Sequence, residues 1–187
     1  LSTFGKISLG GDYMTKINLS QKEKMLLEDQ KKHEEICIQK YTNYANQVQD
    51  PQLKQLFNTY ASQEQQHYNT ISQILSGQVP NMNQGQQQQG QQQQSQGQQG
   101  QQNQQGQQQQ VSSQMEGSAG MTNQSDAELC SDLLMTEKYV SGTYDTTIFE
   151  CTDTNLRNAL NHIQKEEQQH GEGIFNYMHS NGMYNVQ

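Results

Sequence analysis

The tetrapeptide Glu-Gln-Gln-His occurs twice in the sequence, with the two copies 103 residues apart. On a helix, side chains three residues apart lie on the same face, about one turn from each other. A glutamate oxygen and a histidine nitrogen can then reach a single point, and both are ligands of divalent transition metals. Each copy therefore predicts part of a metal site, formed by Glu64 with His67 and by Glu167 with His170.

Two further glutamates interrupt the apolar faces of the other predicted helices. Glu34 lies seven residues after Leu27 and seven before Tyr41, and Glu137 takes the corresponding place in the second half. Residues seven apart share a helix face. Six side chains are therefore expected to face the interior at one level, namely Glu34, Glu64, His67, Glu137, Glu167 and His170.

Four buried carboxylates need compensating charge. They repel one another in a low-dielectric interior, and the desolvation of each costs roughly several kcal/mol. Oxygen ligands with one imidazole for each metal favour iron or manganese over copper, and the lack of thiolate ligands disfavours structural zinc. The sequence predicts two divalent metal ions, Fe or Mn; solvated or internally paired acids are the alternative.

Four neighbouring titratable residues are not assigned as ligands, because the corresponding residue in the other half differs. With those counterparts in brackets, they are Glu35 (Lys138), Glu166 (Gln63), His33 (Thr136) and His162 (Thr59). The two acids also lie off the apolar stripe. We expect both histidines at the surface.

Amphipathic helices must position the ligands. Apolar residues at spacings of three and four predict helices over 20–48, 51–75 and 126–151, and a fourth after Asp153. Asp50 and Asp153 are predicted N-caps of the second and fourth helices. Links this short join antiparallel helix pairs.

The two halves align without gaps at the 103-residue offset. Matching pairs include Leu26 with Leu129, Asp29 with Asp132, Tyr41 with Tyr144, Asp50 with Asp153 and Leu53 with Leu156. This agreement predicts an internal duplication of one helical hairpin. Two such hairpins bury each other's stripes, so the expected fold is an all-α four-helix bundle.

A polar segment joins the halves: residues 84–110 contain only Gln, Gly, Ser95 and Asn103 and cannot bury apolar surface. A flexible linker of about 50 residues reaches roughly 35 to 40 Å, about the length of one helix. The sequence leaves open whether the linker joins the two hairpins of one bundle or connects hairpins in a domain-swapped dimer. We predict five segments, which are an N-terminal extension over 1–19, a hairpin over 20–76, the Gln/Gly-rich linker over 77–125, a hairpin over 126–180 and a tail over 181–187. The extension is expected to be disordered or non-native, and residues 1–13 are interpreted as a misplaced start.

Composition narrows the function classes. A net charge of -8 with only 11 Lys and Arg disfavours a nucleic-acid partner. No apolar run is long enough to span a membrane, and no signal peptide is evident, so we expect a protein that is not secreted. The three cysteines show neither disulfide nor zinc spacing and are expected to be small core residues in a reducing compartment.

For five residues near the predicted ligands, the sequence is compatible with two different roles. Tyr41, Tyr144 and Tyr60 are either ordinary core residues or partners of the site that donate hydrogen bonds or single electrons. Gly171 and Gly173 either leave room for a small molecule to reach the metals or serve helix packing.

The second half resembles a known family. From Leu129 to Val186 the sequence contains a Glu-Cys-Thr-x-x-x-Leu-Arg turn and a closing Tyr-Met…Gly-x-Tyr tail. These residues resemble the coat F domain, a ferritin-like module of spore coat proteins in endospore-forming bacteria, and residues 14–76 resemble it more weakly. The resemblance implies synthesis in the mother-cell cytoplasm, a place in the spore coat and other coat proteins as partners.

The ligand set separately resembles those of bacterioferritin, rubrerythrin and manganese catalase. That likeness implies that Glu64 and Glu167 bridge the metals, with Glu34 and His67 terminal on one and Glu137 and His170 terminal on the other. A redox-active centre of catalase or ferroxidase type is one functional hypothesis. An inert coat component, whose linker serves assembly or cross-linking, is the second. Iron storage lacks support, because nothing specifies the contacts of a cage.

Overall fold

The computed structural model describes residues 15–80 and 124–184. They form the four predicted helices, which are α1 (Gln21–Ala45), α2 (Pro51–Leu75), α4 (Gln124–Glu150) and α5 (Thr154–Ser180). The all-α prediction is confirmed, apart from two short strands. Residues 1–13, most of the predicted linker over 77–125 and the end of the tail over 181–187 lie outside the described ranges.

Side-chain caps determine where three helices begin. Ser20 and Glu23 form a capping box on α1, in which the Ser20 amide donates to Glu23 Oε2 at 2.7 Å. The other carboxylate oxygen of Glu23 accepts from the Thr152 amide at 2.9 Å, which ties the start of α1 to the turn before α5. Asp50 and Asp153 cap α2 and α5, as predicted.

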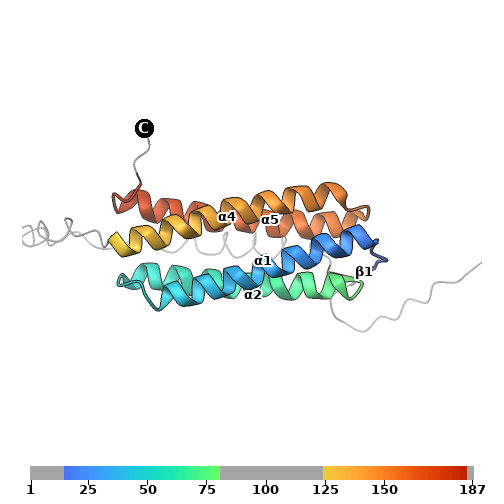
Figure 1. The fold of residues 1–187 in the computed structure, drawn as a ribbon, viewed down its shortest axis with the longest axis horizontal. Coiled ribbons are helices and arrows are strands. Elements are labelled where there is room, and N and C mark those ends of the chain that lie inside the picture. The colour runs from blue at the N-terminus through green and yellow to red at the C-terminus, as the bar shows by residue number, and fades with distance from the viewer. Residues whose placement is uncertain (1–14, 81–123, 185–187) are drawn as a thin grey trace, which may run out of the picture.

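The helices form two antiparallel hairpins packed on each other (Figure 1). Helix α1 packs against α2 and α4, while α5 packs against α4 and α2. The end of α2 and the start of α4 lie at opposite ends of the bundle. The apolar stripes meet in one core, and all three cysteines are buried and free within it, as predicted.

A small sheet closes one end of the first hairpin. Strand β1 (Thr15–Lys16) pairs antiparallel with β2 (Gln78–Val79), and the Ile17 amide donates to the Gly77 carbonyl at 3.0 Å. Gly77 makes the turn after α2 with φ of 85°, a conformation that suits glycine. The last residues of the segment expected as an extension over 1–19 therefore pair with β2 and with the turn after α2.

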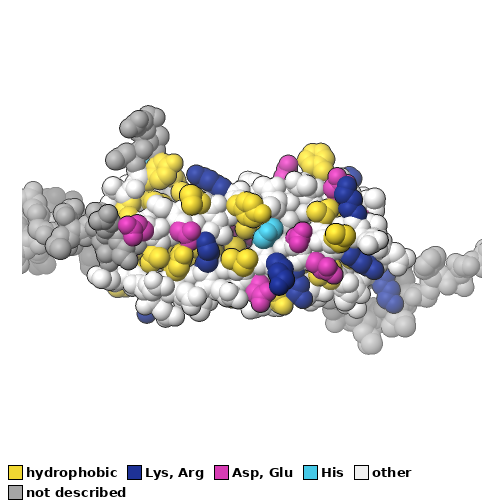
Figure 2. Space-filling model, viewed as in Figure 1, with side chains coloured by type: hydrophobic (Ala, Val, Ile, Leu, Met, Phe, Trp, Pro, Cys, Tyr) yellow, Lys and Arg dark blue, Asp and Glu magenta, His cyan; other side chains and the backbone are white. Residues whose placement is uncertain are grey.

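Polar contacts also join the hairpins near the surface. Asp132 on α4 accepts from Lys40 Nζ at 2.8 Å and from the Tyr44 hydroxyl at 2.6 Å, both on α1. Figure 2 shows acidic and basic side chains interspersed on the face it views. Among the described helices, none combines the length and apolar character that a membrane crossing needs.

Candidate metal centre

The structure brings all six predicted ligands together in the core. Each is at most 3% exposed. They form two groups, whose potential ligand atoms all lie within 4.8 Å of one another in each group. The groups are Glu34, Glu64, His67 and Glu167, and Glu64, Glu137, Glu167 and His170. Glu64 and Glu167 belong to both groups.

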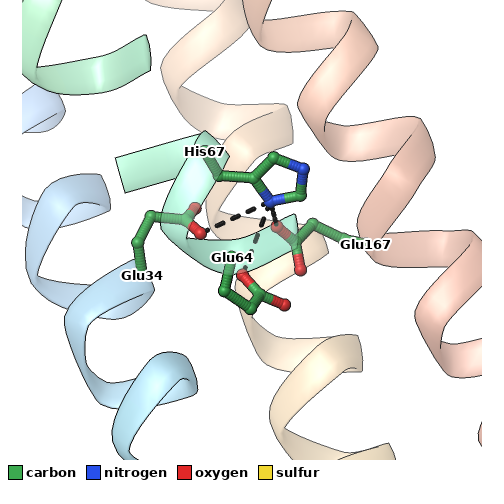
Figure 3. A group of neighbouring side chains, drawn as sticks. All are labelled: Glu34, Glu64, His67 and Glu167. Carbon is green, nitrogen blue, oxygen red and sulfur yellow. Dashed lines mark ion pairs between the residues drawn. The ribbon is translucent and has the colours of Figure 1, made fainter. Parts of the chain in front are cut away.

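Three carboxylates surround one imidazole nitrogen in the first group. Figure 3 shows His67 Nδ1 pointing at Glu167 Oε1, Glu64 Oε2 and Glu34 Oε2, which lie 2.9, 3.4 and 3.5 Å away. No hydrogen bond of acceptable geometry satisfies His67 Nδ1. The potential ligand atoms of this group thus converge on one volume around His67 Nδ1.

The second group repeats this arrangement from the other hairpin. His170 Nδ1 lies 2.9 Å from Glu64 Oε1 and 3.9 Å from both Glu137 Oε2 and Glu167 Oε2. Each hairpin supplies one lone glutamate and one Glu-x-x-His pair. This is the donor set of dinuclear carboxylate sites in helical bundles.

Unpaired buried atoms test whether this donor set fits a cation. Among the described residues, the buried side-chain atoms without a hydrogen-bond partner are Glu34 Oε2, Glu64 Oε2, His67 Nδ1, Glu137 Oε2, Glu167 Oε1 and Glu167 Oε2. All of them belong to the cluster. Leaving such an atom unpaired costs roughly 1 to 3 kcal/mol, and more for a charged group. Two divalent ions among these donors would satisfy them, so the residues fit the predicted metals.

Burial and like charge act on the two lone glutamates. Burial raises the pKa of Glu34 well above its usual range, and the negative charges of Glu167 and Glu64 raise it further. Burial likewise raises the pKa of Glu137, again with repulsion from Glu167 and Glu64. Without a metal, the cluster therefore favours protonation of both side chains.

The pKa shifts of Glu64 and His67 favour their charged forms. Burial would raise the pKa of Glu64, but hydrogen bonds from His170 and His67 outweigh it and lower the pKa to about 2. Burial would lower the pKa of His67, but the surrounding carboxylates, Glu166 foremost, raise it well above its usual range. The metal-free cluster thus holds a proton where a cation would bind.

We expect chelator-treated protein to be more stable near pH 5.5 than near pH 8. Glu34 and Glu137 hold protons in the folded state above 4.5, where the unfolded chain has released them. His67 does the same above 6.5. The folded state binds more protons, so the free energy of unfolding falls as pH rises through these raised pKa values. Thermal unfolding followed by circular dichroism at the two pH values tests this; equal midpoints, or a higher one at pH 8, would contradict it.

Two tyrosines hold the lone glutamates across the hairpin interface. The Tyr41 hydroxyl on α1 donates to Glu137 Oε1, and the Tyr144 hydroxyl on α4 donates to Glu34 Oε1. Both tyrosines are completely buried. The interpretation as hydrogen-bonding partners of the site is therefore confirmed, and a role as electron donors stays a prediction. Tyr60 instead packs its ring on His170, with centroids 4.3 Å apart.

The two glycines near His170, Gly171 and Gly173, have different surroundings in the structure. A Cβ atom at Gly173 would lie 1.8 Å from the Tyr60 hydroxyl oxygen, so this glycine serves packing. Gly171 has no such clash and lines a pocket beside the cluster.

We expect Gly173→Ala to lower the free energy of unfolding by about 1 to 3 kcal/mol, the usual cost of overpacking a core. Gly142→Ala is the matched control, because a Cβ atom there meets nothing within 4 Å. In a helix interior the control is expected to be stabilising by roughly 0.5 to 1 kcal/mol. Urea unfolding of both variants measures the difference, and equal effects would contradict the packing role of Gly173.

Glu166 contacts the cluster and His162 contacts Glu166, although neither was expected from the sequence. Glu166 Oε2 lies 2.9 Å from His67 Nε2 and 3.5 Å from His162 Nε2. In the other half, Gln63 Oε1 lies 3.1 Å from His170 Nε2. Residues 63 and 166 correspond at the 103-residue offset, so each histidine is held from the same place. The equivalent positions of Gln63 and Glu166 in the repeat could have indicated this contact, although their residue types differ.

The prediction that His33 and His162 lie at the surface needs correction. Both are half-buried. His33 Nδ1 lies 3.4 Å from Gln30 Oε1 and from Thr143 Oγ1, because the packing of α1 on α4 covers it. His33 therefore lies in a polar contact between the two hairpins.

Glu166→Gln is expected to weaken metal binding at the His67 group by roughly 10- to 100-fold, the usual effect of losing a carboxylate behind a histidine ligand. Glu35→Gln is the control, since Glu35 is exposed and adjoins Glu34 as Glu166 adjoins Glu167. Titration calorimetry with Mn(II) measures both. Equal affinity in the two variants would show that Glu166 does not support His67.

Comparison with known proteins assigns a family to the second hairpin. Residues 125–187 match the family model described as the Coat F domain, which confirms the resemblance noted for Leu129 to Val186. The weaker resemblance of residues 14–76 stays a prediction. The matched segment includes Glu137, Glu167 and His170. Searches of curated proteins and of solved structures found no match to the chain.

Proposed function

Because residues 125–187 form a Coat F domain, we propose that the protein is a spore coat component with a dinuclear Fe or Mn centre in a ferritin-like bundle. The hairpins over 20–76 and 126–180 would be two copies of one duplicated unit, made in the mother-cell cytoplasm. The 103-residue correspondence and the antiparallel pairing of each hairpin support this origin. Other coat proteins would be its partners.

The set of unpaired buried atoms carries the metal proposal. All of them belong to the six side chains that converge from four helices. Glu64 and Glu167 take part in both groups, which supports their assignment as bridging ligands. Glu34 with His67, and Glu137 with His170, would then be terminal ligands.

When bound, two iron or manganese ions supply one-electron redox chemistry toward peroxide or dioxygen. The side chains have defined parts in that proposal. Tyr41 and Tyr144 orient the lone glutamates, and Glu166 orients His67. The fully buried setting limits water around the ligands, which strengthens their electrostatic interactions. Disproportionation of two hydrogen peroxide molecules to two water molecules and one dioxygen is the reaction we propose first.

Metal analysis and an oxygen-evolution assay test this function. The protein is purified without chelators, its Fe and Mn content is measured, and oxygen release from hydrogen peroxide is followed. About two metals per chain with turnover supports a catalase-type centre. Two metals without turnover against peroxide or Fe(II) supports a structural role. No metal after incubation with Fe(II) or Mn(II) contradicts the centre itself.

The structural alternative has its own support on the surface. Large apolar side chains lie exposed, among them Met25, Met135, Tyr139 and Phe149, the last at 78%. Met135 and Tyr139 line one surface pocket together with the exposed Ile36, and such a group suits packing against other coat components. Light scattering of the purified chain distinguishes a monomer from a homodimer or a domain-swapped dimer.

A further inference from the structure

A pocket of about 530 Å³ lies between α4 and α5, directly beside the acid cluster. Glu137 and Glu167 form part of its wall, and both carry buried oxygen atoms without a hydrogen-bond partner. Gly142 and Gly171 also line it. The absence of side chains at these two positions leaves space between the helices next to the ligands.

The first hairpin is filled at the corresponding place. The pocket residues Leu134 and Gly171 correspond to Lys31 and Tyr68 at the 103-residue offset. There Lys31 Nζ lies over the Tyr68 ring, 4.8 Å from its centroid, so the two side chains bridge α1 and α2. A pseudo-symmetric ligand set is thus enclosed by two hairpins that differ in how they cover it.

A side chain at Gly171 would reduce the space beside the ligands. Its Cβ atom would lie 3.6 Å from Glu137 Cβ and 3.8 Å from Leu134 Cδ1, which is ordinary contact without a clash. A large side chain at position 171 would therefore extend from a point beside Glu137 and Leu134, which both line the pocket. The glycine at this position, where the other half has a tyrosine, is what keeps the pocket open.

We propose that the α4–α5 pocket admits a small uncharged molecule, such as hydrogen peroxide or dioxygen, to the metal centre, whereas Lys31 and Tyr68 close the α1–α2 side. This inference rests on the proposed metal centre. Two divalent ions balance the four predicted ligand carboxylates, so the loaded ligand set itself has no net charge with which to select an ion. Lys138 and Asp145 of the pocket have opposite charges and leave its lining without a dominant sign.

Nitric oxide, a small uncharged probe, tests the route through its association rate with Fe(II)-loaded protein under anaerobic conditions. Gly142→Phe places a ring in the pocket from a position where a Cβ atom has free space. Gln39→Phe is the matched control, at the corresponding position of the first hairpin. We expect Gly142→Phe to slow association at least about tenfold, because entry would depend on a minor open state. Gln39→Phe is expected to keep the wild-type rate.

Further variants separate the possible failures. Gly171→Tyr, which copies the first hairpin, is expected to slow nitric oxide as Gly142→Phe does. Adding Tyr68→Gly to either blocked variant is expected to restore part of the rate by opening the other side. Wild-type rates in both blocked variants, with iron retained, would overturn the route. Failure of the wild-type chain to bind Fe(II) would instead refute the metal centre on which the route depends.

Discussion

Saturating Mn(II) is expected to raise the midpoint of thermal unfolding of chelator-treated protein by more than about 10 °C. A ligand at about 1,000 times its dissociation constant stabilises a folded protein by roughly 4 kcal/mol for each site. In a domain of this size, each kcal/mol raises the midpoint by roughly 2 to 4 °C or more. The metals would also satisfy the buried carboxylate oxygens that lack a hydrogen-bond partner. Scanning calorimetry with and without metal measures the shift.

Mg(II) is the control for this experiment. It demands octahedral coordination and keeps its water ligands, so a buried site with two histidines suits it poorly. We expect Mg(II) to shift the midpoint by less than about 2 °C, of the order of weak, unsaturated binding. A shift with Mg(II) equal to that with Mn(II), or no shift with Mn(II) or Fe(II), would exclude a selective transition-metal centre.

The double variant Glu34→Gln with Glu137→Gln is expected to stabilise the metal-free protein at pH 7 by roughly 1 to 4 kcal/mol, as removal of poorly compensated buried charges can. Burial and repulsion raise the pKa of both glutamates, so their charged forms are unfavourable in the fold. A glutamine oxygen can still accept from the hydroxyls of Tyr144 and Tyr41. The same variant is expected to lose most of the stabilisation by Mn(II), because each metal loses an anionic ligand.

Urea unfolding with and without Mn(II) measures both effects of the double variant. Glu35→Gln is the control, since it removes one exposed carboxylate next to Glu34 and is expected to change stability by less than about 0.5 kcal/mol. A double variant that is less stable without metal would contradict the unfavourable charge at these positions. One that keeps the full response to Mn(II) would show that the two glutamates are not ligands. Gain of stability with loss of binding is the pattern of residues retained for function.

The six converging side chains were predictable because each lies on a regular helix whose period relates sequence to direction. Glu34 and Glu137 interrupt apolar stripes, and each Glu-x-x-His pair points one way from its helix. Caps at Asp50 and Asp153 set both hairpins in the same register. The repeat then identified which acids belong together, since a chance acid has no counterpart in the other half.

The same reasoning failed where a contact depends on a neighbouring helix. Glu166 lies off the stripe of its own helix, yet its carboxylate reaches His67 on α2. The mismatch with Gln63 in the repeat argued against a role, although both side chains hold a histidine. Helical periodicity describes one helix at a time and contains no information about such crossing contacts.

By itself, the sequence determined the four helices, the caps of α2 and α5, the core stripes and the six inward-facing side chains, because these follow from local propensity and helical period. Only the tertiary structure decided that Tyr41 and Tyr144 hold glutamates of the opposite hairpin, that Gly173 makes room for Tyr60, and that the pocket lies beside Gly171. Those features depend on the rotation and separation of packed helices. Such quantities are set by the fit of all side chains at once, and no single segment specifies them.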